Sequence, residues 1–312
     1  MKSIHFERAI FINWYCSKRD CAFCYLASKK NQKQDPNKAK RTKESILAEA
    51  IICKACNWPI EFISGGCDCQ SDEEILEIIK NIYKITNKKL ILNLGTLTEK
   101  QIKLFKPYIE GVCGTVEIIT PKLRDQICPS KPLSEIKKFF KLADKYNLKK
   151  TVTIVLGIGE TLCDIENLKE FLKEHNVERI TFYRLKPQKE TPYEDTKPIT
   201  SKYYTKWVKE IRKDFPNIKI ITGSWLTHLN EINQLLKAGS DGITKFPSIK
   251  KFNSKYAKQI VKEVKKANML FKSNFTKKPK INIEKEVNKL DINKELKDKI
   301  KIKLNEYLKN MN

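Results

Sequence analysis

Three cysteines, the last of them preceded by Phe23, lie close together in the stretch NWYCSKRDCAFCYL (residues 13–26). Cys16, Cys21 and Cys24 form a C-x4-C-x2-C array. Clustered thiolates are typical metal ligands, but a closed structural zinc site needs four ligands. Three thiolates can hold three irons of a [4Fe–4S] cluster and leave the fourth iron open for a substrate. The array therefore favours a reactive iron–sulfur cluster, and a zinc knuckle with a distant fourth ligand is the alternative.

Strands and helices are expected to alternate along the chain in eight successive units. The expected strands are 9–14, 60–63, 89–94, 115–119, 150–157, 179–185, 218–223 and 242–246. The expected helices are 43–58, 71–85, 98–108, 134–147, 163–176, 201–215, 228–239 and 254–271. Alternation of this kind predicts a parallel sheet with right-handed crossovers. Eight units favour closure, so the predicted fold class is α/β, a (βα)8 TIM-like barrel.

One domain is predicted for the barrel, because no linker rich in Pro, Gly or Ser interrupts residues 1–272. Residues 273–312 read as a charged helical C-terminal extension. A cap packed on the barrel wall is the favoured interpretation, and a partner-binding arm is the alternative.

The cysteine array follows the first expected strand, and in a β/α barrel the loop after a strand opens on the catalytic face. Together with Ser64, Gly65 and Gly66 after the second strand, it resembles the radical S-adenosylmethionine (SAM) superfamily. The usual spacing in that superfamily is C-x3-C-x2-C, so the first gap is one residue longer here. The resemblance implies a radical SAM barrel enzyme with a [4Fe–4S] cluster and SAM as cofactors.

The resemblance also implies roles for particular residues. Cys16, Cys21 and Cys24 would be the metal ligands and the catalytic centre. The Ser-Gly-Gly turn would let backbone approach the methionyl amino group of SAM closely, and Phe23 would lie near the adenine. The glycines of IVLGIGET, a segment similar to the G-x-G-E of biotin synthase and HydE, would pass the adenine, and Glu117 would meet the ribose hydroxyls. The implied cofactor-binding residues are Phe23, Ser64, Gly65, Gly66, Glu117, Gly157 and Gly159.

Within the superfamily, the eight-unit barrel and the segments 185–195 and 223–247 are similar to the biotin synthase, HydE and HmdB branch. The lengthened cysteine gap and CPSKP (128–132) are most similar to HmdB-like proteins, which act in biosynthesis of the iron-guanylylpyridinol cofactor of [Fe]-hydrogenase. A Lys/Ile/Asn-rich composition fits a methanogen host. The implied reaction is formation of a 5′-deoxyadenosyl radical that abstracts hydrogen from a small-molecule substrate. The implied electron donor is a reduced ferredoxin or flavodoxin-type protein.

Further cysteines leave open a sulfur-inserting enzyme of the biotin or lipoyl synthase kind. Such an enzyme needs an auxiliary cluster, and four cysteines are expected on the catalytic side. These are Cys67, Cys69, Cys128 and Cys163. We favour the interpretation that they are incidental loop residues. Cys113 is expected to precede the fourth strand as a structural residue.

The formal net charge of +25 raises the alternative of an RNA-modifying enzyme, with the basic stretch 29–41 beside the cysteine loop. We favour a compositional bias, because the charge is spread along the whole chain. No apolar run is long enough for a membrane helix, and no signal peptide is recognised. The expected location is therefore cytoplasmic, without membrane partners, and nucleic acid is not the expected partner.

The end of the sixth strand carries side chains that could contact substrate. Arg184 and Lys186 could meet an anionic group, and Tyr183 or Tyr193 could donate a hydrogen bond. For each of these four residues, an ordinary surface role is the competing interpretation.

Overall fold

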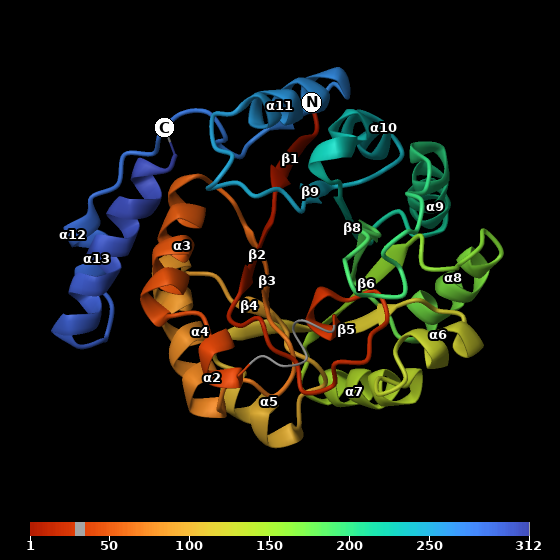
Figure 1. Ribbon diagram of the computed structural model, residues 1–312, viewed down its shortest axis with the longest axis horizontal. Coiled ribbons are helices and arrows are strands. Elements are labelled where there is room, and N and C mark those ends of the chain that lie inside the picture. Colours follow the sequence, from red (N-terminus) through yellow and green to blue (C-terminus); the bar gives the residue numbers. More distant parts are fainter. Residues whose placement is uncertain (29–34, 312) are drawn as a thin grey trace.

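The computed structural model describes residues 1–28 and 35–311. Within these ranges, parallel strands form one curled sheet with helices around its outside (Figure 1). The strands, in spatial order, are β10 (Leu270–Phe271), β1 (Ser3–Phe6), β9 (Gly242–Thr244), β8 (Lys219–Gly223), β7 (Arg179–Arg184), β6 (Lys149–Leu156), β5 (Ile109–Glu117), β4 (Leu90–Asn93), β3 (Ile60–Ser64) and β2 (Arg8–Phe11). The predicted α/β TIM-like fold is confirmed.

The helices alternate with these strands. The α-helices are α2 (Pro36–Ala39), α3 (Lys43–Ala55), α4 (Asp72–Thr86), α5 (Glu99–Phe105), α6 (Pro121–Ile127), α7 (Leu133–Lys145), α8 (Asp164–Glu174), α9 (Ser201–Asp214), α10 (Ile232–Lys237), α11 (Lys255–Lys266), α12 (Ile283–Asn288) and α13 (Lys294–Lys309). Two short 3-10 helices are η1 (Tyr25–Ala27) and η2 (Leu226–Glu231). Among the described helices, none has the length and apolar character that crossing a membrane requires.

The first barrel strand is split between its two neighbours. The Glu7 N–H donates to Ile243 O over 2.8 Å, and the next residue, Arg8, donates to Pro59 O over 2.8 Å. β1 therefore pairs with β9 and β2 with β3, so the N-terminal segment links the two edges of the curled sheet. The strand predicted over 9–14 corresponds to β2, which covers Arg8–Phe11, and the sequence analysis missed the separate strand β1 over Ser3–Phe6.

The helices pack on the sheet through apolar residues at three- and four-residue steps. In α4, Ile75, Ile78 and Ile82 are buried in the main core. A capping box closes the start of α4: the Ser71 N–H donates to the Glu74 carboxylate over 2.8 Å, and the Glu74 N–H donates to Ser71 Oγ over 3.2 Å. A reciprocal cap of this kind fixes where the helix begins.

Several boundaries differ from the sequence prediction, and two of the differences have a clear physical reason. The fourth unit's strand, β5, begins at Ile109, so Cys113 lies inside the strand and not before it. The first half of β5 contains glycines, which are not typical of strands, so the sequence pattern did not predict it. Gly114 is needed at its position because a Cβ there would lie 2.7 Å from Phe140 Cζ of α7. The helix expected to reach residue 271 ends at Lys266, because Asn268 adopts a left-handed conformation with φ of 56°, which stops helices.

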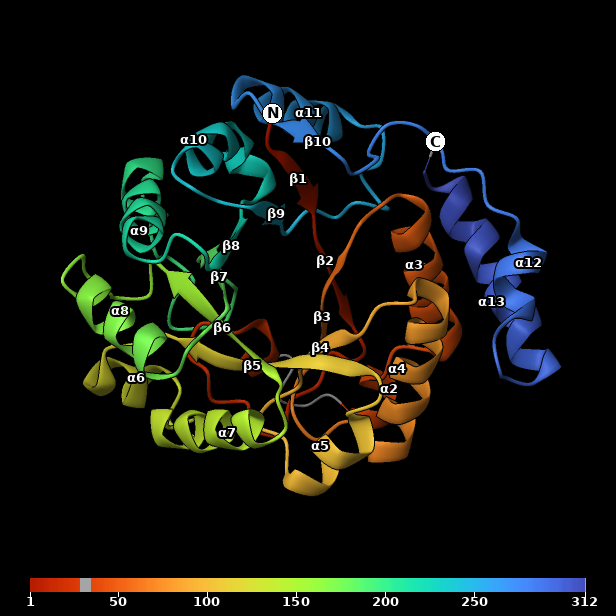
Figure 2. The ribbon, with the colours of Figure 1, turned by 180° about the vertical axis from the view of Figure 1, so that it is seen from behind.

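The C-terminal helices α12 and α13 lie alongside α3 in both views (Figures 1 and 2). Ile300 and Leu304 of α13 are fully buried in the same core as the barrel helices. Lys54 of α3 pairs with Glu286 of α12 over 3.0 Å. The division into a barrel over 1–272 and an extension over 273–312 stays a prediction.

Candidate active site

A cavity of about 570 Å³ opens at the carboxyl ends of the barrel strands. Its wall combines the loops after β2, β3 and β5 with the ends of β7 to β9. Eight of the residues predicted from the sequence line this one cavity. They are Cys16, Cys21, Phe23, Cys24, Ser64, Gly65, Gly66 and Glu117. Folding therefore brings together residues that lie up to 101 positions apart in the chain.

The cysteine loop after β2 is tied to the segment after α6. The Ala22 N–H donates to Ile127 O over 2.8 Å. The Asp20 carboxylate accepts hydrogen bonds from both the N–H and the hydroxyl of Ser130, each over 2.8 Å. These bonds fix the loop against a second element of the barrel, which limits the motion of the cysteines.

A left-handed turn accommodates the extra residue in the first cysteine gap. Arg19 has a φ of 51°, a region that non-glycine residues enter rarely. Its Nε donates to Cys16 O over 3.0 Å, and its guanidinium carbon lies 4.3 Å from the centre of the Tyr15 ring. The longer spacing is thus absorbed locally, and all three cysteines still border the cavity.

Two of the three thiols have a second cysteine beside them. A hydrogen bond from the Cys67 thiol lowers the pKa of Cys16, and one from the Cys128 thiol lowers the pKa of Cys21. Burial raises the pKa of Cys24 to about 11. Because the thiolate is the form that binds metals, the surroundings already favour the ligand form at two of the three positions.

The four cysteines considered for an auxiliary cluster do not converge. Cys67 and Cys128 lie against the cysteine loop, as described above. Cys69 is buried and its Sγ contacts Pro36 O at 3.5 Å. Cys163 is exposed at the start of α8. The described geometry therefore supports incidental roles for Cys69 and Cys163.

Glycines are required after β3 because this loop packs tightly against the cysteine loop. A Cβ at Gly66 would lie 1.8 Å from Tyr15 O, and one at Gly65 would lie 2.6 Å from Asn13 Nδ2. The Gly66 N–H donates to Asn13 Oδ1 over 2.9 Å. The Ser-Gly-Gly turn thus has a structural role in addition to the backbone approach that the sequence predicts.

Lys131 is a residue of the site that the sequence analysis did not single out. It lines the cavity beside the cysteines, and its ammonium hydrogen-bonds to Cys21. The Arg124 guanidinium holds Lys131 O through Nε over 3.0 Å and Nη2 over 2.6 Å. Burial would lower the pKa of Lys131, but the Cys21 thiolate and neighbouring anions raise it above its ordinary value. In the sequence analysis, Lys131 appeared only as part of the CPSKP segment (128–132), without a role of its own.

Glu117 ends β5 and faces the same cavity. Its backbone is left-handed, with a φ of 59°, and its Oε1 accepts a hydrogen bond from Thr153 Oγ1 over 3.2 Å. Burial raises the pKa of Glu117. A carboxyl group held in this way is available to hydroxyl groups of a ligand.

The glycines of the G-x-G-E segment do not line the cavity. Gly157 and Gly159 have φ values of 103° and 114°, which glycine adopts without steric cost. The Glu160 carboxylate closes the turn by accepting from the N–H groups of Gly157 over 2.7 Å and Ile158 over 3.0 Å. The motif therefore forms a self-contained turn beyond Val155, which does line the cavity. Contact of these glycines with an adenine stays a prediction.

Three of the four candidate substrate residues on and after β7 are already engaged within the protein. The Arg184 guanidinium forms a buried ion pair with Glu231. The Tyr183 hydroxyl donates to Glu61 Oε1 over 3.0 Å, and the Tyr193 hydroxyl donates to a backbone oxygen over 2.8 Å. Tyr183, Arg184 and Lys186 all line the cavity, and of these three Lys186 is the exposed one.

Charged side chains occupy the barrel interior below the cavity. Lys219 pairs with Glu7 over 2.7 Å, Glu7 with Arg179 over 2.8 Å, and Arg179 lies 3.7 Å from Glu61. Burial raises the pKa of Glu61. This chain of charges supports the floor of the cavity, because Glu61 also accepts the hydrogen bond from Tyr183.

The basic stretch 29–41 is described only in part, since residues 29–34 lie outside the described ranges. Lys40 pairs with Glu74 over 2.8 Å and Arg41 with Glu49 over 2.8 Å. These two cations are therefore engaged within the protein, which gives no support to an RNA-binding role for them.

A sequence model of the radical SAM superfamily matches residues 15–172, half of the 312-residue chain. The chain belongs to the radical SAM superfamily. An uncharacterized protein of Methanocaldococcus jannaschii is 44% identical over 263 residues, covering 84% of this radical SAM chain and 72% of that protein. A biotin synthase of Methanococcus aeolicus is 30% identical over 178 residues, or 56% of this chain. The match spans 54% of that synthase's length.

Solved structures show the same fold. Methylornithine synthase (PylB) superposes with a TM-score of 0.68 at 14% identity, covering 78% of this chain and 72% of that one. The FeFe-hydrogenase maturase HydG from Carboxydothermus hydrogenoformans gives a TM-score of 0.68 at 15% identity, covering 98% and 77%. Radical SAM membership makes the chain an enzyme and implies a [4Fe–4S] cluster and SAM as cofactors.

The residues present fit such a cluster in their chemistry. Three thiols of one loop border one cavity, and Lys131 places a positive charge beside them. Across residues 1–28 and 35–311, no group of three or more His, Cys, Asp or Glu side chains is already gathered as a metal-binding set. Two of the three thiols are hydrogen-bonded to other cysteines. Cys16 and Cys21 would give up these thiol–thiol hydrogen bonds if they held the cluster.

Proposed function

We propose that Cys16, Cys21 and Cys24 hold three irons of a [4Fe–4S] cluster and leave the fourth iron to SAM. When bound, the cluster supplies the electron that cleaves SAM to methionine and a 5′-deoxyadenosyl radical, which abstracts hydrogen from a small-molecule substrate. The observation that supports this most directly is the placement of the three thiols on one cavity with the Ser-Gly-Gly turn and Glu117. The half-enclosed barrel end also limits access of water to a reactive species.

Residues around the cavity are proposed to orient SAM. The turn at Gly65 and Gly66 offers backbone at the amino group, and Phe23 offers an apolar face to the adenine. Glu117 is placed to accept hydrogen bonds from ribose hydroxyls, since its carboxylate lines the cavity and is steadied by Thr153. Gly157 and Gly159 would contact the adenine through their backbone, beside Val155, which lines the cavity.

Anaerobic reconstitution with iron and sulfide, followed by dithionite and SAM, tests this function. We expect about four irons per chain and release of 5′-deoxyadenosine, with no release when dithionite is left out. A cluster-loaded sample that binds SAM without releasing 5′-deoxyadenosine, or a purified protein containing zinc in place of iron, would contradict the proposal.

We further propose an HmdB-like role in cofactor biosynthesis, namely of the iron-guanylylpyridinol cofactor of [Fe]-hydrogenase, with a reduced ferredoxin or flavodoxin-type donor. The lengthened cysteine gap, with its turn at Arg19, and the close packing of the CPSKP segment against the cysteine loop support this branch. Similarity to an uncharacterized methanogen protein is compatible with it.

A sulfur-inserting enzyme is the second candidate, favoured by the similarity to biotin synthase and to a lipoyl synthase of Schizosaccharomyces pombe at 28% identity. That reaction needs a second cluster. Because Cys67, Cys69, Cys128 and Cys163 do not share one site in the described structure, we expect iron counting to give about four irons and not six or more per chain.

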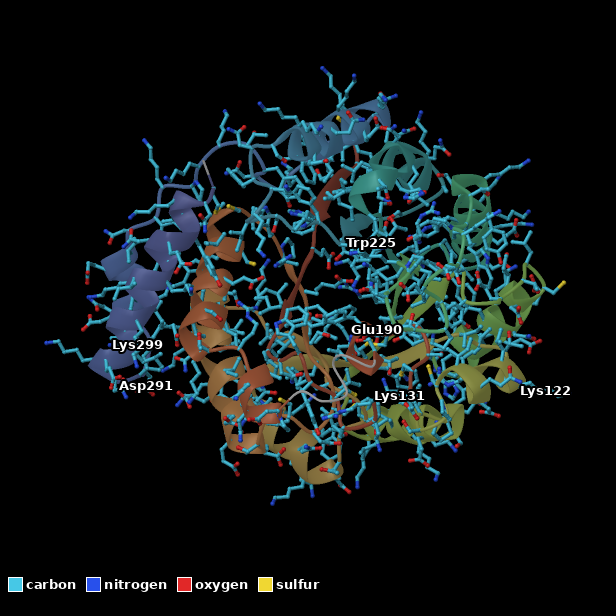
Figure 3. All side chains as sticks on the ribbon, viewed as in Figure 1. Lys122, Lys131, Glu190, Trp225, Asp291 and Lys299 are labelled. Atoms are coloured by element: carbon cyan, nitrogen blue, oxygen red, sulfur yellow. The ribbon has the colours of Figure 1, made fainter. Side chains whose placement is uncertain are left out.

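Lys131→Met is expected to lower the midpoint potential of the cluster by on the order of 50 mV, because a nearby cation stabilises the more negative reduced state. Redox titration followed by electron paramagnetic resonance measures this shift. Lys122→Met is the matched control, since Lys122 is exposed on the neighbouring helix α6 (Figure 3). An unchanged potential in Lys131→Met would show that its charge does not act on the cluster.

A further inference from the structure

Lys245 stands at the carboxyl end of β9 and lines the cavity. Its backbone is left-handed, with a φ of 67°, a conformation that strains a lysine and concentrates at functional sites. None of the roles assigned above uses this residue. The strain indicates that the surrounding structure holds the lysine in this position.

The Lys245 ammonium is held over aromatic rings. Its Nζ lies 4.5 Å from the centre of the Tyr183 ring and 5.7 Å from that of Trp225. The Lys186 Nζ lies 5.0 Å from the same Trp225 ring. Trp225 follows β8, and Figure 3 shows it toward β8 and β9, away from Lys131. Two cations therefore share one indole, in a part of the cavity separate from the lysine beside the cysteines.

Within the described ranges, the Lys245 ammonium has neither a hydrogen bond nor an ion pair to a carboxylate, and residues 29–34 contain no Asp or Glu. The carboxyl groups of Glu61 and Glu117 act on it only at longer range, and burial lowers its pKa. A desolvated cation is unfavourable unless an anion compensates it. Aromatic faces compensate only part of this cost.

The position is built into the barrel by its neighbours. A Cβ at Gly223 would lie 2.7 Å from Lys245 Cγ and 2.7 Å from Tyr183 Cδ1, so only glycine leaves room for both side chains. The Trp225 Nε1–H donates to Arg184 O over 3.1 Å, which fixes the indole. Tyr183 is fixed through its hydroxyl to Glu61.

We propose that Lys245, assisted by Lys186, binds a carboxylate of the substrate, so that the substrate is a small organic acid. This inference rests on the proposed function, because it names the substrate class of the same cavity. A monoanionic carboxylate matches the Lys245 ammonium that is held against the Tyr183 and Trp225 rings. A phosphate dianion would bring surplus negative charge toward Glu61 and Glu117, and the aromatic walls suit an apolar carbon chain.

Saturation-transfer NMR on the cluster-loaded enzyme with SAM tests the proposal with butyrate, and with butyramide as its neutral isostere. We expect a butyrate signal at least five-fold stronger than that of butyramide. Lys245→Met should reduce the butyrate signal at least five-fold, whereas Lys299→Met, an exposed lysine of α13, should not. Equal concentrations of inorganic phosphate should not displace butyrate.

Several results would overturn this assignment: no butyrate signal in the wild type, an unchanged signal in Lys245→Met, or displacement by phosphate. A weaker affinity for SAM in Lys245→Met would instead assign the lysine to the carboxylate of SAM. If that variant does not fold, Lys186→Met replaces it, with a two-fold loss expected and no loss contradicting the proposal. Release of 5′-deoxyadenosine by the wild type separately decides the proposed function.

Discussion

Cys24→Ala is expected to lose most of its iron and to release 5′-deoxyadenosine at least about 100-fold more slowly than the wild type. Changes in residues that merely orient metal ligands already cost 10–100-fold, and this variant would remove a ligand itself. Burial disfavours the Cys24 thiolate unless a metal compensates it. Iron analysis, the absorbance near 400 nm and 5′-deoxyadenosine release measure the effect.

The assignment of the three ligands can be tested against neighbouring cysteines. Cys67 and Cys128 lie beside the three cysteines of the array. Cys128→Ala removes a buried thiol that hydrogen-bonds to Cys21, and it should keep about four irons per chain. Cys163→Ala removes an exposed thiol and should match the wild type. If Cys128→Ala lost its iron as completely as Cys24→Ala, the assignment of the ligands to the C-x4-C-x2-C array would be wrong.

Much of the site was predictable because each motif follows a strand. In a parallel barrel the carboxyl ends of all strands meet at one face, so Cys16, Ser64 and Glu117 had to gather once the alternation of strands and helices was recognised. The glycines of the Ser-Gly-Gly turn were equally visible. Their tight packing against Tyr15 could be recognised only in the three-dimensional structure.

Other features could not be predicted, because their residue types carry no signal in this chain. With 62 Lys and Arg residues, Lys131 and Lys245 do not stand out, and only three-dimensional placement separates them from surface lysines. The hydrogen bond between Cys67 and Cys16 joins residues 51 positions apart. The pairing of strands switches sides between Glu7 and Arg8, and Glu7 pairs with Arg179 and Lys219; a local sequence pattern reveals neither feature.

Arg184→Met is expected to destabilise the protein by about 3–5 kcal/mol, because removing one partner leaves a buried charge without compensation. Arg184 and Glu231 are each 1% exposed in their side chains. Glu231 also accepts hydrogen bonds from Ser224 Oγ and Ser201 Oγ, both over 2.8 Å. The carboxylate thus joins β7, α9 and the segment after β8.

Thermal unfolding of the wild type and variants side by side measures this loss. With an unfolding entropy of about 2.1 cal/mol/K per residue, a chain of 312 residues shifts by about 1.5 °C per kcal/mol, so the melting temperature should fall by about 5–8 °C. Arg184→Met combined with Glu231→Gln should be more stable than Arg184→Met alone, since the uncompensated charge is gone. Lys138→Met, which breaks an exposed pair with Glu135, should change stability by less than about 1 kcal/mol.

The double variant decides what this ion pair does. If Arg184→Met, Glu231→Gln alone and the double variant all lose the same stability, packing and not charge accounts for the loss. If the double variant recovers stability but loses butyrate binding, the ion pair positions the residues that bind butyrate. The Arg184 backbone oxygen accepts the hydrogen bond from the Trp225 indole, on which Lys245 and Lys186 lie. The pair would then have two separable effects. The Glu231 carboxylate would stabilise the fold through its contacts with Ser201 and Ser224, and the backbone oxygen of residue 184 would position Trp225 for substrate binding.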